Sequence, residues 1–299
     1  MKLRIQHRTT YRYAQQVLLG PHRLMLRPRE GHDIQIEHLA LEIKPAHQLR
    51  WIRDVYGNSI AVVHFTEPTA ELVVYSELTL HHFDANPFDF QIEPEAIFYP
   101  FLYDMETFQE LAALMQVIYT ADSARVRQWL NGFWLAGQTI DTLALLQRLN
   151  STIAYTFKYQ IRHEPGVQSP AVTLEKNSGS CRDFATLFIE ACRSLGLGAR
   201  FVSGYILSGG VGASTHAWAE VYLPGGGWKG FDPTLGLLTT SQHVPVAVSR
   251  HPEHAAPISG SFTGPGSAFL HAEVDVDVVE IPPAPFIPSS SFSTQAQSS

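Results

Sequence analysis

The first third of the chain alternates apolar and polar residues with a period of two, which is typical of strands with one buried face. Such runs cover 2–13, 34–43, 60–65 and 71–80. Turn-forming residues separate them, for example Gly57-Asn58. We therefore expect residues 1–95 to form a β-sandwich domain.

The periodicity becomes helical after a proline-rich break at 84–100. Three amphipathic segments follow between 105 and 150, and Asp141 is a suitable N-cap for the third. Alternation returns in the segment 270–281, which we expect to be a closing strand of the second domain. The predicted class is α+β, with a second domain over 96–282, and a disordered Pro/Ser-rich tail over 283–299.

Composition narrows the functional classes. The net charge of −7 (21 basic and 28 acidic residues) opposes non-specific nucleic-acid binding, and no run of 18 apolar residues predicts a membrane span. The charged start, 1–13, resembles neither a signal peptide nor an anchor, so we expect a cytoplasmic protein. Cys181 and Cys192 would lie about 16 Å apart along one helix, too far for a disulfide, so both should be free thiols.

Cys181 is the first candidate for chemistry. Ser180 is a suitable N-cap, and an apolar stripe follows it until Gly196 ends the predicted helix. Cys181 then lies in the first turn, where free N–H groups and the helix dipole favour the reactive thiolate. Cys192 falls among apolar residues of the same helix, where packing is the better interpretation.

Two further residues could complete a site with Cys181. His216 begins an alternating segment, 216–223, on its polar face, where a general base could reach a cleft. Asp232 ends the next predicted strand, and a carboxylate beside a histidine holds its tautomer. A simple hairpin that pairs Leu223 with Trp228, however, places Asp232 opposite Ala219, on the wrong face. We therefore expect a bulge or a longer turn in this glycine-rich hairpin.

Together these segments resemble the core of the transglutaminase-like superfamily. The family's Gly-x-Cys-Arg-Asp-Phe-Ala, His-Ala-Trp-x-Glu-Val and Gly-Phe-Asp-Pro-Thr patterns correspond to 179–185, 216–221 and 230–234. The front of the chain, including 54–58, resembles the β-rich N-terminal domain of bacterial members. The resemblance covers nearly all of the chain before the tail. It implies a papain-like core in which helices pack on an antiparallel sheet. The Cys, His and Asp motifs of this core lie within 175–236, and the helical segment 105–150 precedes them in the chain.

The resemblance implies thiol-dependent acyl transfer on peptide or protein amides. Cys181 would be the nucleophile, His216 the base and Asp232 its orienting partner, with the Cys181 N–H as one oxyanion donor. Hydrolysis is the favoured outcome, because bacterial members are generally described as candidate cysteine proteases. Trp218 and Tyr205 could line the cleft, although aromatic residues on strands more often belong to the core.

Three alternatives stay open on the sequence. The same triad could transfer the acyl group to an amine, or the domain could be a non-catalytic interaction module. A metal enzyme is the third, since ligand-type residues occur at His243, His251, Glu253 and His254. Because Pro252 opposes a helical ligand face there, we predict neither a metal nor a cofactor. The glycine-rich segments are not phosphate loops, and 208–214 is a candidate lid.

Overall fold

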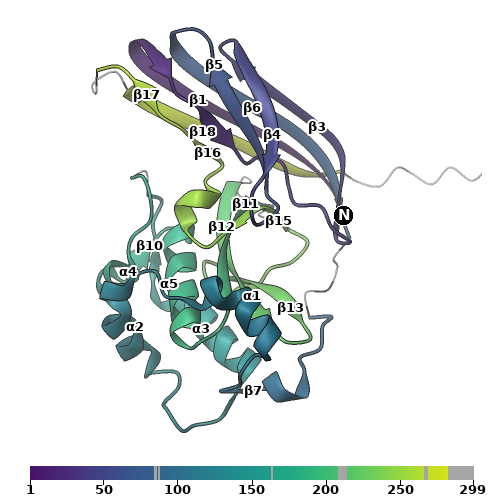
Figure 1. The fold of residues 1–299 in the computed structure, drawn as a ribbon, viewed down its shortest axis with the longest axis vertical. Coiled ribbons are helices and arrows are strands. Elements are labelled where there is room, and N and C mark those ends of the chain that lie inside the picture. Colours follow the sequence, from purple (N-terminus) through teal and green to yellow (C-terminus); the bar gives the residue numbers. More distant parts are fainter. Residues whose placement is uncertain (84–85, 87, 163, 208–213, 266–268, 282–299) are drawn as a thin grey trace, which may run out of the picture.

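The architecture is described from a computed structural model that covers residues 1–83, 86, 88–162, 164–207, 214–265 and 269–281. Two β-sheets face each other in one unit, and a third sheet with the helices forms the other (Figure 1). The predicted α+β class is therefore confirmed. The tail 283–299 and most of the candidate lid, 208–213, lie outside the described residues.

The N-terminal unit is a sandwich of two antiparallel sheets. The five-stranded sheet has the order β17-β1-β6-β3, with β18 also paired to β1, and the four-stranded sheet has the order β16-β2-β5-β4. Their bounds are β1 Lys2–Leu19, β2 His22–Leu24, β3 Ile34–Lys44, β4 His47–Arg53, β5 Ser59–Phe65, β6 Thr69–His82, β16 Ile258–Ser259, β17 Phe262–Thr263 and β18 Phe269–Ile281. Buried residues from both sheets meet in one cluster that includes Val17, Leu72 and Val63, so the predicted sandwich is confirmed.

The second unit is built on an antiparallel sheet of order β14-β13-β12-β11-β15. Its strands are β11 Ala199–Ile206, β12 Ser214–Leu223, β13 Gly227–Asp232, β14 Leu237–Leu238 and β15 His243–Ser249. Two short strand pairs lie outside it, namely β7 Phe98–Tyr99 with β8 Ile140–Asp141 and β9 Lys158–Tyr159 with β10 Ser178–Gly179. β9 and β10 pair in parallel, and β10 leads directly into the helix that follows it.

Helices cover one face of this sheet. They are α1 Met105–Met115, α2 Ser123–Leu130, α3 Thr142–Thr156, α4 Pro170–Lys176 and α5 Cys181–Ser194, with 3-10 turns η1 Pro94–Ala96, η2 Thr120–Asp122 and η3 Pro252–Ala255. The predicted N-cap Asp141 accepts the Ala144 N–H at 2.7 Å. The described residues also include α4, a short helix that the sequence pattern did not predict.

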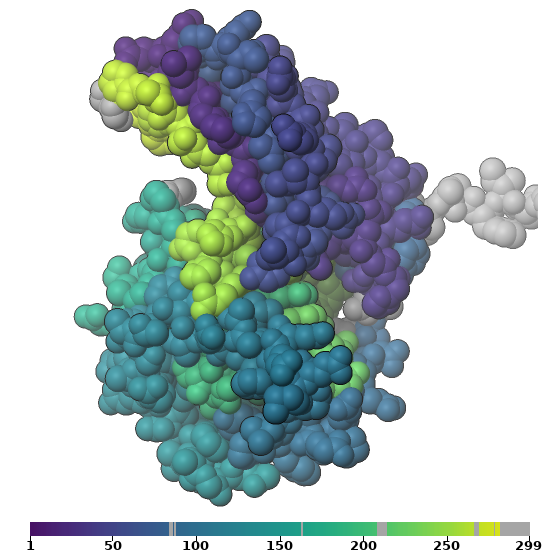
Figure 2. Space-filling model, viewed as in Figure 1, coloured from purple at the N-terminus to yellow at the C-terminus, as the bar shows by residue number. Residues whose placement is uncertain are grey.

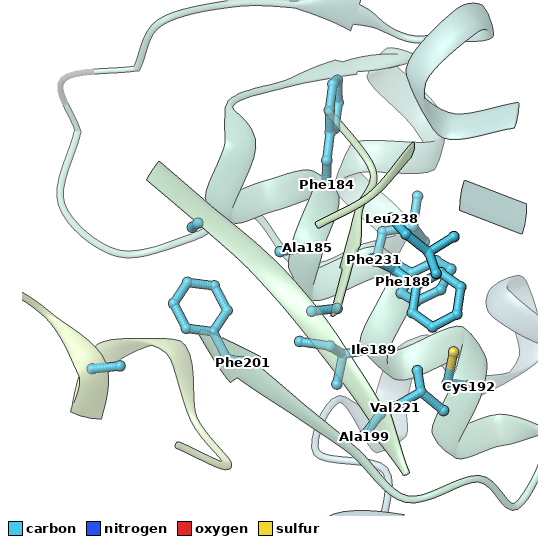
Figure 3. Packing of buried hydrophobic residues seen from close by; sticks show 14 of the residues in the cluster. Phe184, Ala185, Phe188, Ile189, Cys192, Ala199, Phe201, Val221, Phe231 and Leu238 are labelled. Carbon is cyan, nitrogen blue, oxygen red and sulfur yellow. The ribbon is translucent and has the colours of Figure 1, made fainter. Parts of the chain in front are cut away.

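The central helix α5 is buried along most of its length. Phe188 and Cys192 project from it into an apolar cluster with Val221 of β12 and Phe231 of β13 (Figure 3). Each large side chain removed from water here contributes about 1.5–3 kcal/mol. Because the same cluster extends to Leu3 and other residues of the sandwich, the two units share one continuous core.

The prediction that 270–281 closes the second domain is wrong. This segment, β18, pairs antiparallel with β1 over Lys2 to Tyr13 and so completes the N-terminal sheet. In Figures 1 and 2 the yellow end of the described chain lies beside the purple start. Alternation indicates that a strand has a buried face, but it does not identify the neighbouring strand. The last strand of the core sheet is β15, which ends at Ser249.

None of the helices in the described ranges is long and apolar enough to cross a membrane.

Candidate active site

Cys181 is the first residue of α5, and the loop before it is tightly held. A Cβ on Gly179 would approach the Cβ of Asp183 to 2.8 Å, so glycine is required there. The buried Asp183 carboxylate accepts the Ser180 N–H at 2.8 Å and the Arg162 guanidinium at 2.7 Å. These contacts hold the Cys181 thiol at the N-terminus of the helix, where the backbone N–H groups and the helix dipole present a positive potential. The predicted placement of Cys181 in the first turn is confirmed.

The two thiols have different surroundings. Both are free, as the sequence predicts, and Cys181 is partly exposed whereas Cys192 is fully buried. Burial raises the pKa of the Cys192 thiol, which keeps it protonated. Its sulfur lies within the apolar cluster of Figure 3. Cys181 is therefore the accessible thiol of the pair.

His216 lies near the start of β12, between a thiol and a carboxylate. Its Nε2 is 2.8 Å from Oδ2 of Asp232, and its ring also hydrogen-bonds the Cys181 side chain. Burial alone would lower the pKa of His216, but the hydrogen bonds and negative charges of Asp232 and Cys181 raise it to about 10. The site therefore favours the protonated, positively charged form of His216.

The hairpin that carries His216 and Asp232 corrects the predicted register. Leu223 pairs with Gly227, not with Trp228, and pairing continues without a shift to Ala219 and Phe231. β13 is therefore shifted by one residue along β12 relative to the expected alignment. No bulge or longer turn is present between β12 and β13, contrary to our prediction.

This one-residue change puts the Asp232 carboxylate on the same face of the sheet as His216. Asp232 follows Phe231 and so lies across from Trp218, two positions from His216 and on the same side of the sheet. The turn at 224–226 contains Gly225, with φ of +78°, and β13 begins directly after it at Gly227, with φ of +69°. Glycine adopts these left-handed conformations at little cost, which permits the short connection.

His243 is a member of the cluster that sequence reasoning did not assign to the triad. Its Nε2 lies 3.1 Å from Oδ2 of Asp232, the same oxygen that contacts His216. The Thr240 N–H donates to its Nδ1 at 3.1 Å, and the Trp218 ring meets it edge-on at 5.3 Å. It begins β15, on the far side of β11 from β12, so no local spacing could have connected it with Asp232.

The grouping of His216, Asp232 and His243 resembles a metal site in its ligand types. One ligand atom from each lies within 4.8 Å of the others. Because the Thr240 N–H points at Nδ1 of His243, that nitrogen is unprotonated, and Nε2 carries the proton. A protonated nitrogen cannot bind a metal, so these residues do not fit one.

The metal ligands considered from the sequence do not assemble either. His243 contacts Asp232, while His251 and His254 belong to the segment at η3, where their tilted rings lie with centroids 5.3 Å apart. The Arg250 guanidinium lies 2.9 Å from Nε2 of His251, which opposes a second cation there. Within the described ranges, none of these three histidines forms a metal-ligand group with Glu253.

Tyr159 is a second residue that the sequence pattern did not reveal. Its strand, β9, is two residues long, too short for alternation to indicate. It pairs with Gly179, and its ring packs on Phe184 at 6.3 Å, over the first turn of α5. Burial, followed by the charge and hydrogen bond of Cys181, raises the pKa of Tyr159 to about 12. Its phenol is thus a protonated donor at the sulfur.

The N-terminal unit supports the strand that carries His216. Tyr56 packs against buried Trp218, in a cluster with Val202 and Val248. Gly204 leaves room for the indole, because a Cβ there would lie 2.8 Å from it. Trp218 is therefore a core residue that also borders a small cleft of about 120 Å³ with His243.

Tyr205, the other aromatic residue considered for the cleft, belongs to the contact between the units. Its hydroxyl lies 2.9 Å from Nδ1 of His7, and both side chains are buried. Burial lowers the pKa of His7 to about 4, so this imidazole is neutral at pH 7.

Two segments of the chain match known protein families. Residues 3–81 match the bacterial transglutaminase-like N-terminal region, and residues 135–233 match the transglutaminase-like superfamily. The uncharacterized protein Rv2569c of Mycobacterium tuberculosis is 28% identical over 300 residues, covering 92% of each chain. The uncharacterized protein ML0607 of Mycobacterium leprae is 24% identical over 287 residues, covering 92% of this chain and 98% of that protein.

A solved structure extends the likeness to the whole fold. The crystal structure of a candidate cysteine protease from Cytophaga hutchinsonii has a TM-score of 0.71 and 20% sequence identity. The match covers 97% of this chain and 94% of that chain. The sandwich and the helix-covered sheet therefore recur together in another protein.

Proposed function

We propose that this protein, whose residues 135–233 match the transglutaminase-like superfamily, is a cysteine enzyme that transfers acyl groups from peptide or amide bonds. One observation carries the proposal. His216 lies 2.8 Å from the Asp232 carboxylate and hydrogen-bonds the partly exposed Cys181 thiol. A thiol nucleophile, a histidine base and a carboxylate that orients the histidine form the arrangement that activates a thiol. Free thiols support a reducing, cytoplasmic location as part of the proposal.

The proposed reaction forms and breaks one thioester. Sγ of Cys181 bonds to the amide carbonyl carbon, and the carbonyl π electrons move onto oxygen. When the tetrahedral intermediate collapses, the C–N bond breaks and His216 donates its proton to the leaving amine. The oxygen of a water molecule then bonds to the thioester carbonyl carbon while His216 takes a proton from the water. The C–S bond breaks, and the carboxylic acid leaves with Cys181 restored as thiolate.

Two groups are available to stabilise the oxyanion. The Cys181 N–H lies in the first turn of α5, where helix geometry provides no carbonyl partner. The Tyr159 hydroxyl contacts the same thiol and stays protonated at neutral pH. Such preorganised donors are each worth about 3 kcal/mol of transition-state stabilisation. We assign Tyr159 as the second donor, which the sequence left open.

Hydrolysis is the acyl transfer that we favour. The support is family likeness, including the fold shared with the candidate cysteine protease of Cytophaga hutchinsonii. The alternative acceptor is a primary amine, as in transglutaminase chemistry, since the same thioester serves both outcomes. This chain departs from the family pattern in two segments. Leu235-Gly236 follows the matching 230–234, where the family usually continues with Asn, and 249–252, at the end of β15, replaces a Gly-Arg-Asp-Tyr-like segment of bacterial relatives. We expect both segments to influence substrate choice.

The experiment that tests this proposal compares products from a peptide library. The protein is incubated with the library, with and without an excess of a fluorescent primary amine, and the products are analysed by mass spectrometry. Cys181→Ala is the inactive control, and Cys192→Ala is the matched control that keeps the nucleophile.

The outcomes separate the three functions. New termini or side-chain deamidation that depend on Cys181 support hydrolysis, whereas incorporation of the amine supports transfer. A library left unchanged, together with no preferential labelling of Cys181 by a thiol-reactive amide probe, would favour a non-catalytic module and refute the proposal.

A further inference from the structure

The Asp232 carboxylate accepts more hydrogen bonds than the orientation of His216 requires. Its Oδ2 accepts from Nε2 of His216 at 2.8 Å and from Nε2 of His243 at 3.1 Å. Its Oδ1 accepts the backbone N–H groups of Thr234 at 2.8 Å and Leu235 at 3.3 Å. Asp232 is fully buried, so these four donors replace its water shell.

The protonation of His243 follows from its contacts. The Thr240 N–H donates to Nδ1 at 3.1 Å, so a neutral ring must carry its proton on Nε2, which faces Asp232. The His243 N–H in turn donates to the Thr240 carbonyl at 2.9 Å. These reciprocal contacts hold the ring in one orientation, and His243 is almost fully buried.

We propose that His243 is a positioning residue for the catalytic histidine, acting through the carboxylate. It donates a second hydrogen bond to the oxygen that holds His216, which limits rotation of the carboxylate and keeps it ionised. His243 touches neither the substrate nor the sulfur in this role. The inference rests on the proposed function, because positioning has meaning only if His216 acts on Cys181.

Aromatic and titratable groups from several elements surround His243. From β12, His216 and Trp218 face its ring at centroid distances of 6.2 and 5.3 Å. From β6, Nε2 of His82 lies 3.2 Å from the His243 carbonyl oxygen. The cleft beside it is also bordered by charged or titratable side chains of other elements, namely Asp33, Glu220 and Lys229. Asp232 is the carboxylate that His243 contacts.

Three substitutions separate donation from packing. His243→Gln can place an amide N–H near the position of Nε2 and keep the bond to Asp232. His243→Asn can still accept the Thr240 N–H, but its shorter side chain cannot reach Asp232. His243→Ala removes both contacts. Thermal unfolding of each variant checks that it is folded.

The primary measurement needs no substrate. Iodoacetamide alkylates the accessible Cys181, and its rate at pH 6–7 reports the thiolate–imidazolium pair. We expect His243→Asn and His243→Ala to slow alkylation about 10-fold to 100-fold, the value of one hydrogen bond to a charged group. His243→Gln should stay within about threefold of the unmodified protein. On a peptide substrate, kcat should fall in the same order with KM changed less than about twofold.

Two results would overturn the inference. One is an alkylation rate for folded His243→Asn and His243→Ala within twofold of the unmodified protein. The other is a His243→Gln variant that is as slow as His243→Ala, which would indicate a packing role. Failure of the proposed function has a different signature, namely the expected ranking of alkylation rates without any Cys181-dependent turnover.

Discussion

Replacing Asp232 with asparagine removes the charge that holds His216 while keeping the size of the side chain. All four hydrogen bonds of the carboxylate are accepted from N–H groups. An asparagine must turn its NH₂ group toward one pair of these donors, because only one of its two terminal atoms is an acceptor. If the NH₂ faces the histidines, the His216 ring must change tautomer or move.

The magnitude follows from the His216 imidazolium. Its pKa rises from 6.5 to about 10, which corresponds to on the order of 5 kcal/mol in favour of the charged form. Two groups raise this pKa against the lowering effect of burial. The hydrogen bond and charge of Asp232 contribute more, and those of Cys181 contribute less. Losing Asp232 should therefore cost about 3 kcal/mol, or about 100-fold in turnover, and up to about 10⁴-fold with the wrong tautomer.

The raised pKa of His216 also sets the direction in which turnover changes with pH. The raised pKa means that His216 is charged below about pH 10 and loses its proton, and with it the ion pair, as the pH rises through that value. Turnover should therefore fall on the alkaline side near pH 10. In Asp232→Asn the His216 pKa should drop by about 2, which moves this alkaline limit to about pH 8.

The assay is a pH–rate profile on the peptide identified by the library screen, with alkylation of Cys181 measured in parallel. Asp183→Asn is not a suitable control, because Asp183 holds the loop before Cys181. Glu220→Gln, on β12 with His216, is the charge-neutralising control. An alkaline limit unmoved from pH 10 in folded Asp232→Asn, with turnover reduced less than fivefold, would refute the reasoning.

Three further predictions concern stability and reactivity. Burial lowers the pKa of His7 to about 4, so its contribution to stability is present above pH 6.5 and is lost as the pH falls through 4, about 3 kcal/mol in all. Urea unfolding at pH 7 and pH 4 should show this loss. A His7→Gln variant with the same pH dependence would contradict it. Asn58→Ala should cost about 3 kcal/mol in denaturant unfolding, because the buried amide bonds both the N–H and the carbonyl of Val248, and a loss below 1 kcal/mol would count against this account. Cys192→Ala should still take up one iodoacetamide per folded chain by mass spectrometry, and Cys181→Ala none; labelling of Cys192 in the folded protein would show that its burial is not protective.

Local sequence was sufficient for the features that depend on near neighbours. Ser180 before an apolar stripe predicted a helix that begins at Cys181, and Gly196 its end, because capping and amphipathicity act within a few residues. The alternation of β1, β3, β5 and β6 predicted the sandwich in the same way. Motif resemblance then indicated the transglutaminase-like core that the comparisons support.

Tertiary structure decided which distant segments meet. The hairpin register differed by one residue from the simplest alignment, and that difference placed Asp232 beside His216. Strand pairing placed β18 in the N-terminal sheet, and it brought His243 of β15 to Asp232 of β13 across β11 and β12. The side-chain period of a strand does not identify its neighbour in either case. Side-chain period and capping are properties of a short stretch of backbone, so the sequence determined them. Strand pairing depends on burying complementary faces from remote parts of the chain, so only the folded molecule could decide it.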